Sequence, residues 1–90
     1  MNQKFAINEQ VSSLGIVAEG DILRDDKIKF VFENPGTVEV YVKINGQTGW
    51  DLLDTISSNL IINVTMYDQI RIVALSSDFK LIAVGFDDVQ

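Results

Sequence analysis

The feature that most constrains the fold is a period-two alternation of apolar and polar residues between Lys27 and Asn45. The second half alternates without a break, and its apolar positions are Val38, Val40, Val42 and Ile44. Successive side chains of a β-strand point to opposite faces, so this pattern predicts a strand with one buried face. A similar strand is predicted before it, with apolar positions Ile28, Phe30 and Phe32.

The segment between these strands has the sequence Asn34-Pro35-Gly36-Thr37. This order is typical of a type II turn, in which proline fixes φ at the second position and glycine supplies a positive φ at the third. The sequence therefore predicts a β-hairpin with a positive φ at Gly36. It also predicts that Val40 and Val42 are buried.

Further strands are predicted over residues 60–65, 69–75 and 80–86, because apolar runs there are separated by turn signals at 57–59, 66–68 and 76–78. The last two runs are partly apolar on both faces, which is typical of interior strands or of strands that contact a partner. Asn45-Gly46 predicts another turn with positive φ.

Two segments allow more than one interpretation. Residues 50–56 fit a strand, or a short helix capped by Thr48, and the meander-like spacing of the turns favours the strand. The first 25 residues fit short strands at 5–7 and 14–18, a brief helix over 8–18, or an extended arm that orders on contact with another subunit.

The composition supports a mostly β protein, since 25 of the 90 residues are Val, Ile or Thr. β-branched side chains pack well on a pleated sheet and lose rotamer freedom on a helix. We therefore predict a single all-β domain, an antiparallel β-sandwich or barrel of six to eight strands. Residues 26–90 would form the sandwich, and residues 1–25 an arm or edge strands.

Missing residue types exclude several kinds of chemistry. The chain has no cysteine and no histidine, so one chain can form no disulfide, thiolate nucleophile, imidazole base or Cys/His zinc site. Its net charge of −6 disfavours nucleic acid and anionic membranes as partners. There is no apolar stretch of signal-peptide or membrane-spanning length, so we expect synthesis in the cytoplasm.

The carboxylates are the main remaining acid–base candidates: Asp51 with Asp54, Asp21, Asp25 with Asp26, and Asp87 with Asp88. A glycosidase needs two carboxyl groups about 5–10 Å apart in a cleft, which so small a sandwich rarely provides. The calcium-loop pattern Asp-x-Asp-x-Asp-Gly is absent. We expect no catalytic residues, no metal and no cofactor.

Aromatic side chains are the stronger candidates for a binding surface. Tyr41 lies on the polar face of its predicted strand, and Trp50 and Tyr67 lie beside turns. Such side chains stack on sugars or anchor protein contacts, and Arg71 fits an interface as well. The alternative is structural: Trp50 in the core, Tyr41 covering a cross-strand neighbour, and Arg71 paired with Asp68.

The residues 38–46, Trp50 and 68–72 together form a pattern that resembles small β-sandwich accessory proteins of tailed bacteriophage virions. Examples of that class are capsid decoration, head–tail and tail-surface subunits. The resemblance covers about residues 37–75. It lies in a strand that ends in an Asn-Gly turn, a following aromatic strand, and an acid that opens a strand bearing arginine.

This resemblance implies a non-enzymatic virion protein that binds a symmetric lattice of capsid or tail proteins and forms a homo-oligomer. It implies a location in the virion. The alternative function is a carbohydrate-binding or host-adhesion module that uses Trp50, Tyr41 and Tyr67.

Overall fold

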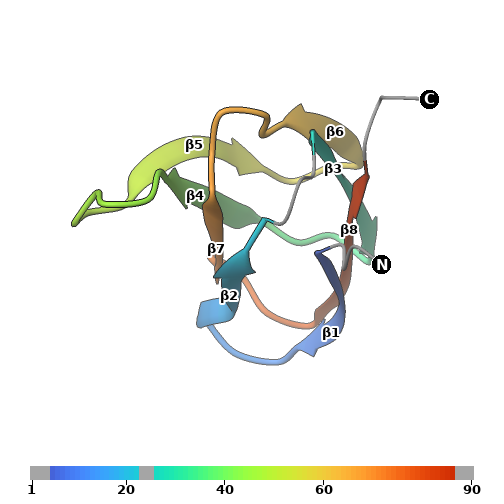
Figure 1. Ribbon diagram of the computed structural model, residues 1–90. Coiled ribbons are helices and arrows are strands. Elements are labelled where there is room, and N and C mark those ends of the chain that lie inside the picture. Colours follow the sequence, from blue (N-terminus) through green and yellow to red (C-terminus); the bar gives the residue numbers. More distant parts are fainter. Residues whose placement is uncertain (1–4, 23–25, 87–90) are drawn as a thin grey trace.

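The computed structural model describes residues 5–22 and 26–86, and in these residues it contains eight β-strands and no helix (Figure 1). The strands are β1 (Ala6–Val11), β2 (Gly15–Asp21), β3 (Lys27–Glu33), β4 (Val38–Lys43), β5 (Asp51–Ile56), β6 (Leu60–Asn63), β7 (Gln69–Ala74) and β8 (Phe79–Phe86).

The strands form two four-stranded antiparallel sheets that pack face to face. Sheet A has the order β1-β8-β3-β6, and sheet B has the order β2-β7-β4-β5. The prediction of a small all-β sandwich is confirmed. The strands β7 and β8, which are apolar on both faces, occupy interior positions of their sheets, as the sequence predicts.

The strand pairing is nested along the chain. The pairs are β1 with β8, β2 with β7, β3 with β6 and β4 with β5. The first half of the chain thus pairs antiparallel with the second half, and successive pairs alternate between the two sheets. This is the arrangement of a jelly roll.

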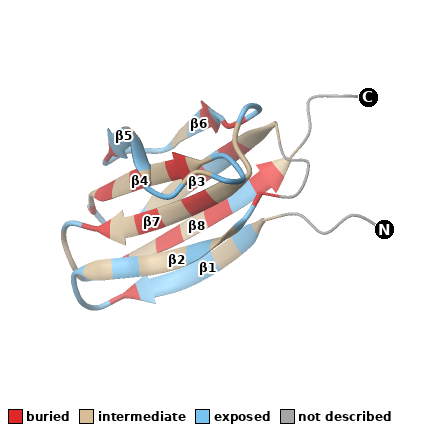
Figure 2. Cartoon of the chain, turned by 60° about the vertical axis from the view of Figure 1, so that its left-hand side comes forward, coloured by how far each residue is buried: buried red, intermediate tan, exposed pale blue. Residues whose placement is uncertain are grey.

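The core lies between the sheets and consists of the inward-facing side chain of every second residue (Figure 2). Val38, Val40 and Val42 are buried on β4, as the alternation predicts, whereas Ile44 lies beyond the end of this strand and is 51% exposed. The largest fully buried side chains are Phe30 and Phe79. Figure 2 also shows that β1 and β5, both at sheet edges, are mostly exposed.

The predicted hairpin between residues 27 and 45 is wrong. The strands β3 and β4 belong to different sheets, and each pairs with other strands. Two consecutive strands can bury one face either by pairing in one sheet or by facing each other across the core. The alternation of residues is the same in both arrangements, so it cannot distinguish them.

The type II turn is also wrong. Positive φ occurs at Asn34 (73°) and not at Gly36. Gly36 is required for another reason, because a Cβ atom at this position would lie 2.3 Å from Cγ of Phe79. The connection passes directly over the ring of a core phenylalanine, and only glycine leaves room for it.

The predicted Asn45-Gly46 turn is present, with φ of 91° at Gly46. It joins β4 to β5, which form an antiparallel hairpin. The segment at residues 51–56 is a strand, so the helical alternative is wrong. A register shift between Val40 and Tyr41 marks a bulge in this pair.

The beginning of the chain forms two of the eight strands. The strand β1 is an edge of sheet A and β2 is an edge of sheet B, so the helix considered for residues 8–18 is wrong. Residues 6–21 belong to the sandwich rather than to an arm. Residues 1–4 and 23–25 of the segment 1–25 lie outside the described residues.

Candidate functional site

The candidate site lies on the outer face of sheet B. Lys43 and Tyr41 alternate with the buried valines of β4, so both point outward. Tyr41 is opposite Arg71 on β7, and Arg71 is opposite Glu19 on β2. One row of polar side chains therefore crosses three neighbouring strands.

Trp50 covers part of this row. The Nζ atom of Lys43 lies 4.8 Å from the centroid of the indole ring, and Cζ of Arg71 lies 4.6 Å from it. Because β4 separates β5 from β7, the indole must extend across β4 to reach Arg71. Cations over an aromatic face are attracted by its negative π-density. These two contacts hold Trp50 half-buried on the outside of the sheet.

Arg71 is held from its other side by Glu19. Its Nη2 and Nε atoms lie 2.6 Å and 2.7 Å from Oε2 of Glu19. Both partners remain partly exposed, so this ion pair contributes little to stability, about 0.2–1 kcal/mol. Its main consequence is geometric, because it fixes the guanidinium against the indole.

Tyr41 completes the cluster. Its hydroxyl donates a hydrogen bond of 2.8 Å to Oε1 of Glu39, two residues away on the same face of β4. That bond, together with desolvation and the negative charge of Glu39, raises the pKa of Tyr41 above its ordinary value. We call this cluster the Trp50 surface, and its members are Glu19, Glu39, Tyr41, Lys43, Trp50 and Arg71.

The structure brings together three of the four side chains singled out from the sequence: Tyr41, Trp50 and Arg71. Tyr67 lies in the turn between β6 and β7 and packs against the core, outside this cluster. The ion pair considered between Arg71 and Asp68 is replaced by the pair with Glu19. A carboxylate oxygen of Asp68 instead accepts a hydrogen bond of 2.7 Å from the backbone N–H of Asn45.

Sequence reasoning missed three members of the Trp50 surface. Lys43 and Glu39 share the period-two face of Tyr41, so the alternation of β4 contained the signal for both. Glu19 had no such signal. It meets Arg71 only because β2 and β7, which are far apart in the chain, are neighbours in sheet B.

The carboxylates considered for catalysis do not form a cleft. Asp51 and Asp54 are exposed on the edge strand β5. Asp25, Asp87 and Asp88 lie outside the described residues. Within residues 5–22 and 26–86, no three acidic side chains gather in a way that could hold a metal ion.

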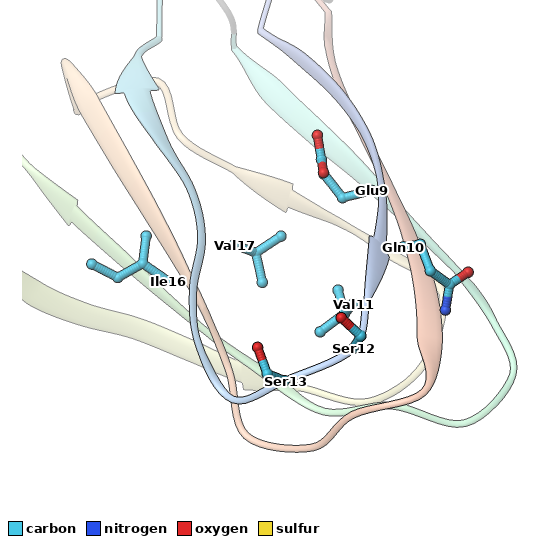
Figure 3. Close-up of a pocket in the computed structure, with 7 residues that line it drawn as sticks. All are labelled: Glu9, Gln10, Val11, Ser12, Ser13, Ile16 and Val17. Atoms are coloured by element: carbon cyan, nitrogen blue, oxygen red, sulfur yellow. The ribbon is translucent and has the colours of Figure 1, made fainter.

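A small depression lies elsewhere, between the edge strands β1 and β2 (Figure 3). Its volume is about 150 Å³, and Glu9, Val11 and Val17 point into it, whereas Gln10 points away. Glu9 is its only titratable group, and Ser12 and Ser13 add hydroxyls. One exposed carboxylate has no acid–base partner here, so this depression offers no pair for hydrolysis.

The arrangement on sheet B consists of groups that are common in binding surfaces. It presents an aromatic ring, a guanidinium and a phenol on the outer face of one sheet. Residues 5–22 and 26–86 include no helix with the length and apolar character needed to cross a bilayer.

Comparison with known proteins found no matching family model, no similar curated protein and no similar solved structure. The fold and the site define a small jelly-roll domain with an exposed aromatic and arginine surface.

Proposed function

We propose that this protein is a non-enzymatic structural subunit that binds protein neighbours in a symmetric assembly, and that this assembly is a virion. Its partners would be further copies of the chain and the capsid or tail proteins of the same particle. The observation that carries the proposal is the Trp50 surface.

The composition of this surface supports a protein contact. Tryptophan, tyrosine and arginine are the residues most enriched among those that dominate binding energy at protein interfaces. Trp50 and Arg71 are also held in place before any partner arrives, by Lys43 and Glu19. Binding a partner therefore costs less side-chain entropy than it would if these two side chains were free to rotate.

The fold supports, by analogy, the proposal that the assembly is a virion. Jelly rolls occur in viral capsid domains and also in lectins and cupins. A fold alone does not determine function, so this analogy adds to the argument from the Trp50 surface and does not replace it.

A carbohydrate-binding module is the second candidate, favoured by the half-buried indole on the outside of sheet B and by the occurrence of jelly rolls among lectins. Two features weigh against it. A sugar stacking on a ring face covered by Lys43 or Arg71 would have to displace that cation. Tyr67, which would provide a further stacking platform, packs against the core instead.

Light scattering on the purified chain over a range of concentrations tests the proposal. We expect the mass to rise from 10.0 kDa to a defined multiple. Trp50→Ala should shift this transition to higher concentration, whereas Met66→Ala, which removes an exposed side chain in the β6–β7 turn, should not. A mass that stays at 10.0 kDa at all concentrations would overturn the proposal.

The carbohydrate alternative predicts a different result. Emission from Trp50, the single tryptophan of the chain, would change on titration with glycans while the mass stayed that of a monomer. Removal of residues 1–25 is not a useful variant, because it deletes β1 and β2 from the sandwich. Detection of the chain in protease-washed virus particles would test the virion setting, and its absence from them would overturn that setting.

A further inference from the structure

The outer face of sheet A carries an apolar strip. On this face Val31 of β3 is opposite Ile82 of β8. Beside them, Lys29 of β3 lies between Ile61 of β6 and Val84 of β8. Ile61 is 53% exposed and Val84 is 41% exposed. Apolar side chains thus run across three strands in the middle of the face, open to solvent.

Lysine side chains lie on the same face as this apolar strip. The described outward positions of β3 and β8 include three lysines and a single carboxylate, namely Lys27, Lys29, Lys80 and Glu33. Within the described part of the chain, neither Lys29 nor Lys80 forms an ion pair. The whole chain carries −6 and this face carries +2, so the remaining residues carry −8. We call this surface the lysine face.

The strand β5 has the complementary character. It is an edge of sheet B, and Asp51, Leu52, Asp54 and Thr55 are exposed on it. Leu52 is 52% exposed. The hairpin that β5 forms with β4 projects from the body of the molecule at the left of Figure 1. Leu52 is opposite the outward-facing Tyr41, whereas Asp51 and Asp54 are opposite the inward-facing Val42 and Val40, so the two carboxylates share the other side of this protruding edge.

We propose that the lysine face is a docking surface whose occupant is the acidic strand β5 of a second copy of this chain. Asp51 and Asp54, which share one side of β5, would lie near Lys29 and Lys80, beside the apolar strip. The charges of the two surfaces are opposite. This inference rests on the proposed function, because it names the partner of one surface in the assembly.

The size of the face is sufficient for a stable contact. The molecule measures 33 × 32 × 20 Å, so one side of the sandwich offers at most roughly 1,000 Å². Specific interfaces bury about 800 Å² on each partner. Trp50 directly precedes β5, so the Trp50 surface would border the same contact and contribute to it.

The two surfaces lie on different parts of the molecule, which determines the symmetry. Each copy would offer its lysine face to one neighbour and its β5 strand to another. Such a head-to-tail contact produces a closed ring when the rotation between neighbours closes, and an open array when it does not.

Charge reversal tests this pairing. One variant carries Lys29→Glu with Lys80→Glu, and the other carries Asp51→Lys with Asp54→Lys. Each variant alone would bring like charges together, and we expect its self-association to weaken by at least about tenfold. Mixed in equal amounts, the two variants should associate again, because every contact in an alternating array joins opposite charges. The chain with all four substitutions should also self-associate.

The matched control for the Asp51→Lys/Asp54→Lys variant is Glu9→Lys with Asp21→Lys, which raises the net charge by the same amount but lies on the opposite edges of the sheets. It should associate like the original chain, and circular dichroism should show that every variant is folded. Mixed variants that do not regain association would overturn the inference. If both reversed variants keep the original mass while Trp50→Ala does not, the inference fails and the proposed function stands. A monomeric original chain would contradict the proposed function itself.

Discussion

The outer faces of the two sheets differ in how their charges are held. On sheet B, Arg71 pairs with Glu19 and both cations near Trp50 contact its ring. On sheet A, Lys29 and Lys80 flank apolar side chains without an ion pair in the described part of the chain. Charges that already have internal partners help to order a surface, whereas charges without them are available to a neighbour. Changes on sheet B should therefore alter both stability and association, and changes on sheet A mainly association.

The largest effect should come from the core that both faces share. Gly36→Val would place side-chain atoms against the buried ring of Phe79, where a Cβ alone lies 2.3 Å from Cγ. Such overpacking lowers the free energy of unfolding by about 1–3 kcal/mol or more. Urea denaturation measures this loss. Because both sheets share the core, the substitution should destabilise the Trp50 surface and the lysine face together.

Gly20→Val is the control for this substitution. No atom lies within 4 Å of a Cβ added at Gly20, so we expect a much smaller change. Equal stability of the two variants would show that the close approach of Gly36 to Phe79 does not constrain the fold.

The next largest effect separates the faces. Trp50→Ala removes two cation contacts at a partly exposed site, each worth about 0.5–1 kcal/mol. We expect a loss of about 1–2 kcal/mol in the free energy of unfolding of the monomer. Lys29→Ala on sheet A should change it by less than about 0.5 kcal/mol. Urea denaturation at low protein concentration measures both changes. Equal losses for Trp50→Ala and Lys29→Ala would contradict the claim that only the charges on sheet B contribute to stability.

A smaller effect concerns the ion pair on sheet B. Glu19→Gln should lower stability by about 0.2–1 kcal/mol, since the side chains of Arg71 and Glu19 are 31% and 43% exposed. High salt should reduce the difference between the variant and the original chain, because it screens exposed charges. A difference that is unchanged by salt would mean that Glu19 acts through packing and not through its charge.

The smallest effect is the titration of Tyr41. Its hydrogen bond to Glu39 raises its pKa above the ordinary value, so folding favours the protonated phenol. This contribution to stability is complete below the unfolded pKa of about 10 and is lost as the pH rises through the folded pKa. In a Tyr67→Phe background, Glu39→Gln should lower the pKa measured from phenolate absorbance. An unchanged pKa would contradict the role of Glu39.

Much of the fold followed from periodicity. Alternation identified β4 and its buried valines, and Asn45-Gly46 identified the turn before β5. Alternation states which side chains face a core, but it does not state which sheet a strand joins. The alternation in β3 and β4 therefore predicted a hairpin, although these two strands belong to different sheets.

The candidate site was predictable to a similar extent. Tyr41 could be singled out because it lies on the polar face of a clear strand, and Trp50 because it lies beside a turn. Glu19 could not, since its contact with Arg71 depends on the pairing of β2 with β7. Gly36 shows the same limit, because its requirement arises from a ring more than forty residues along the chain.

The most direct test of the account is acrylamide quenching of Trp50 emission as the concentration of the unmodified protein is raised. The chain has one tryptophan, so the signal reports on the Trp50 surface alone. We expect quenching to fall in step with the rise in mass, because the indole becomes covered by a neighbouring copy. Quenching that stays constant while the mass rises would show that assembly uses another surface and would contradict the account.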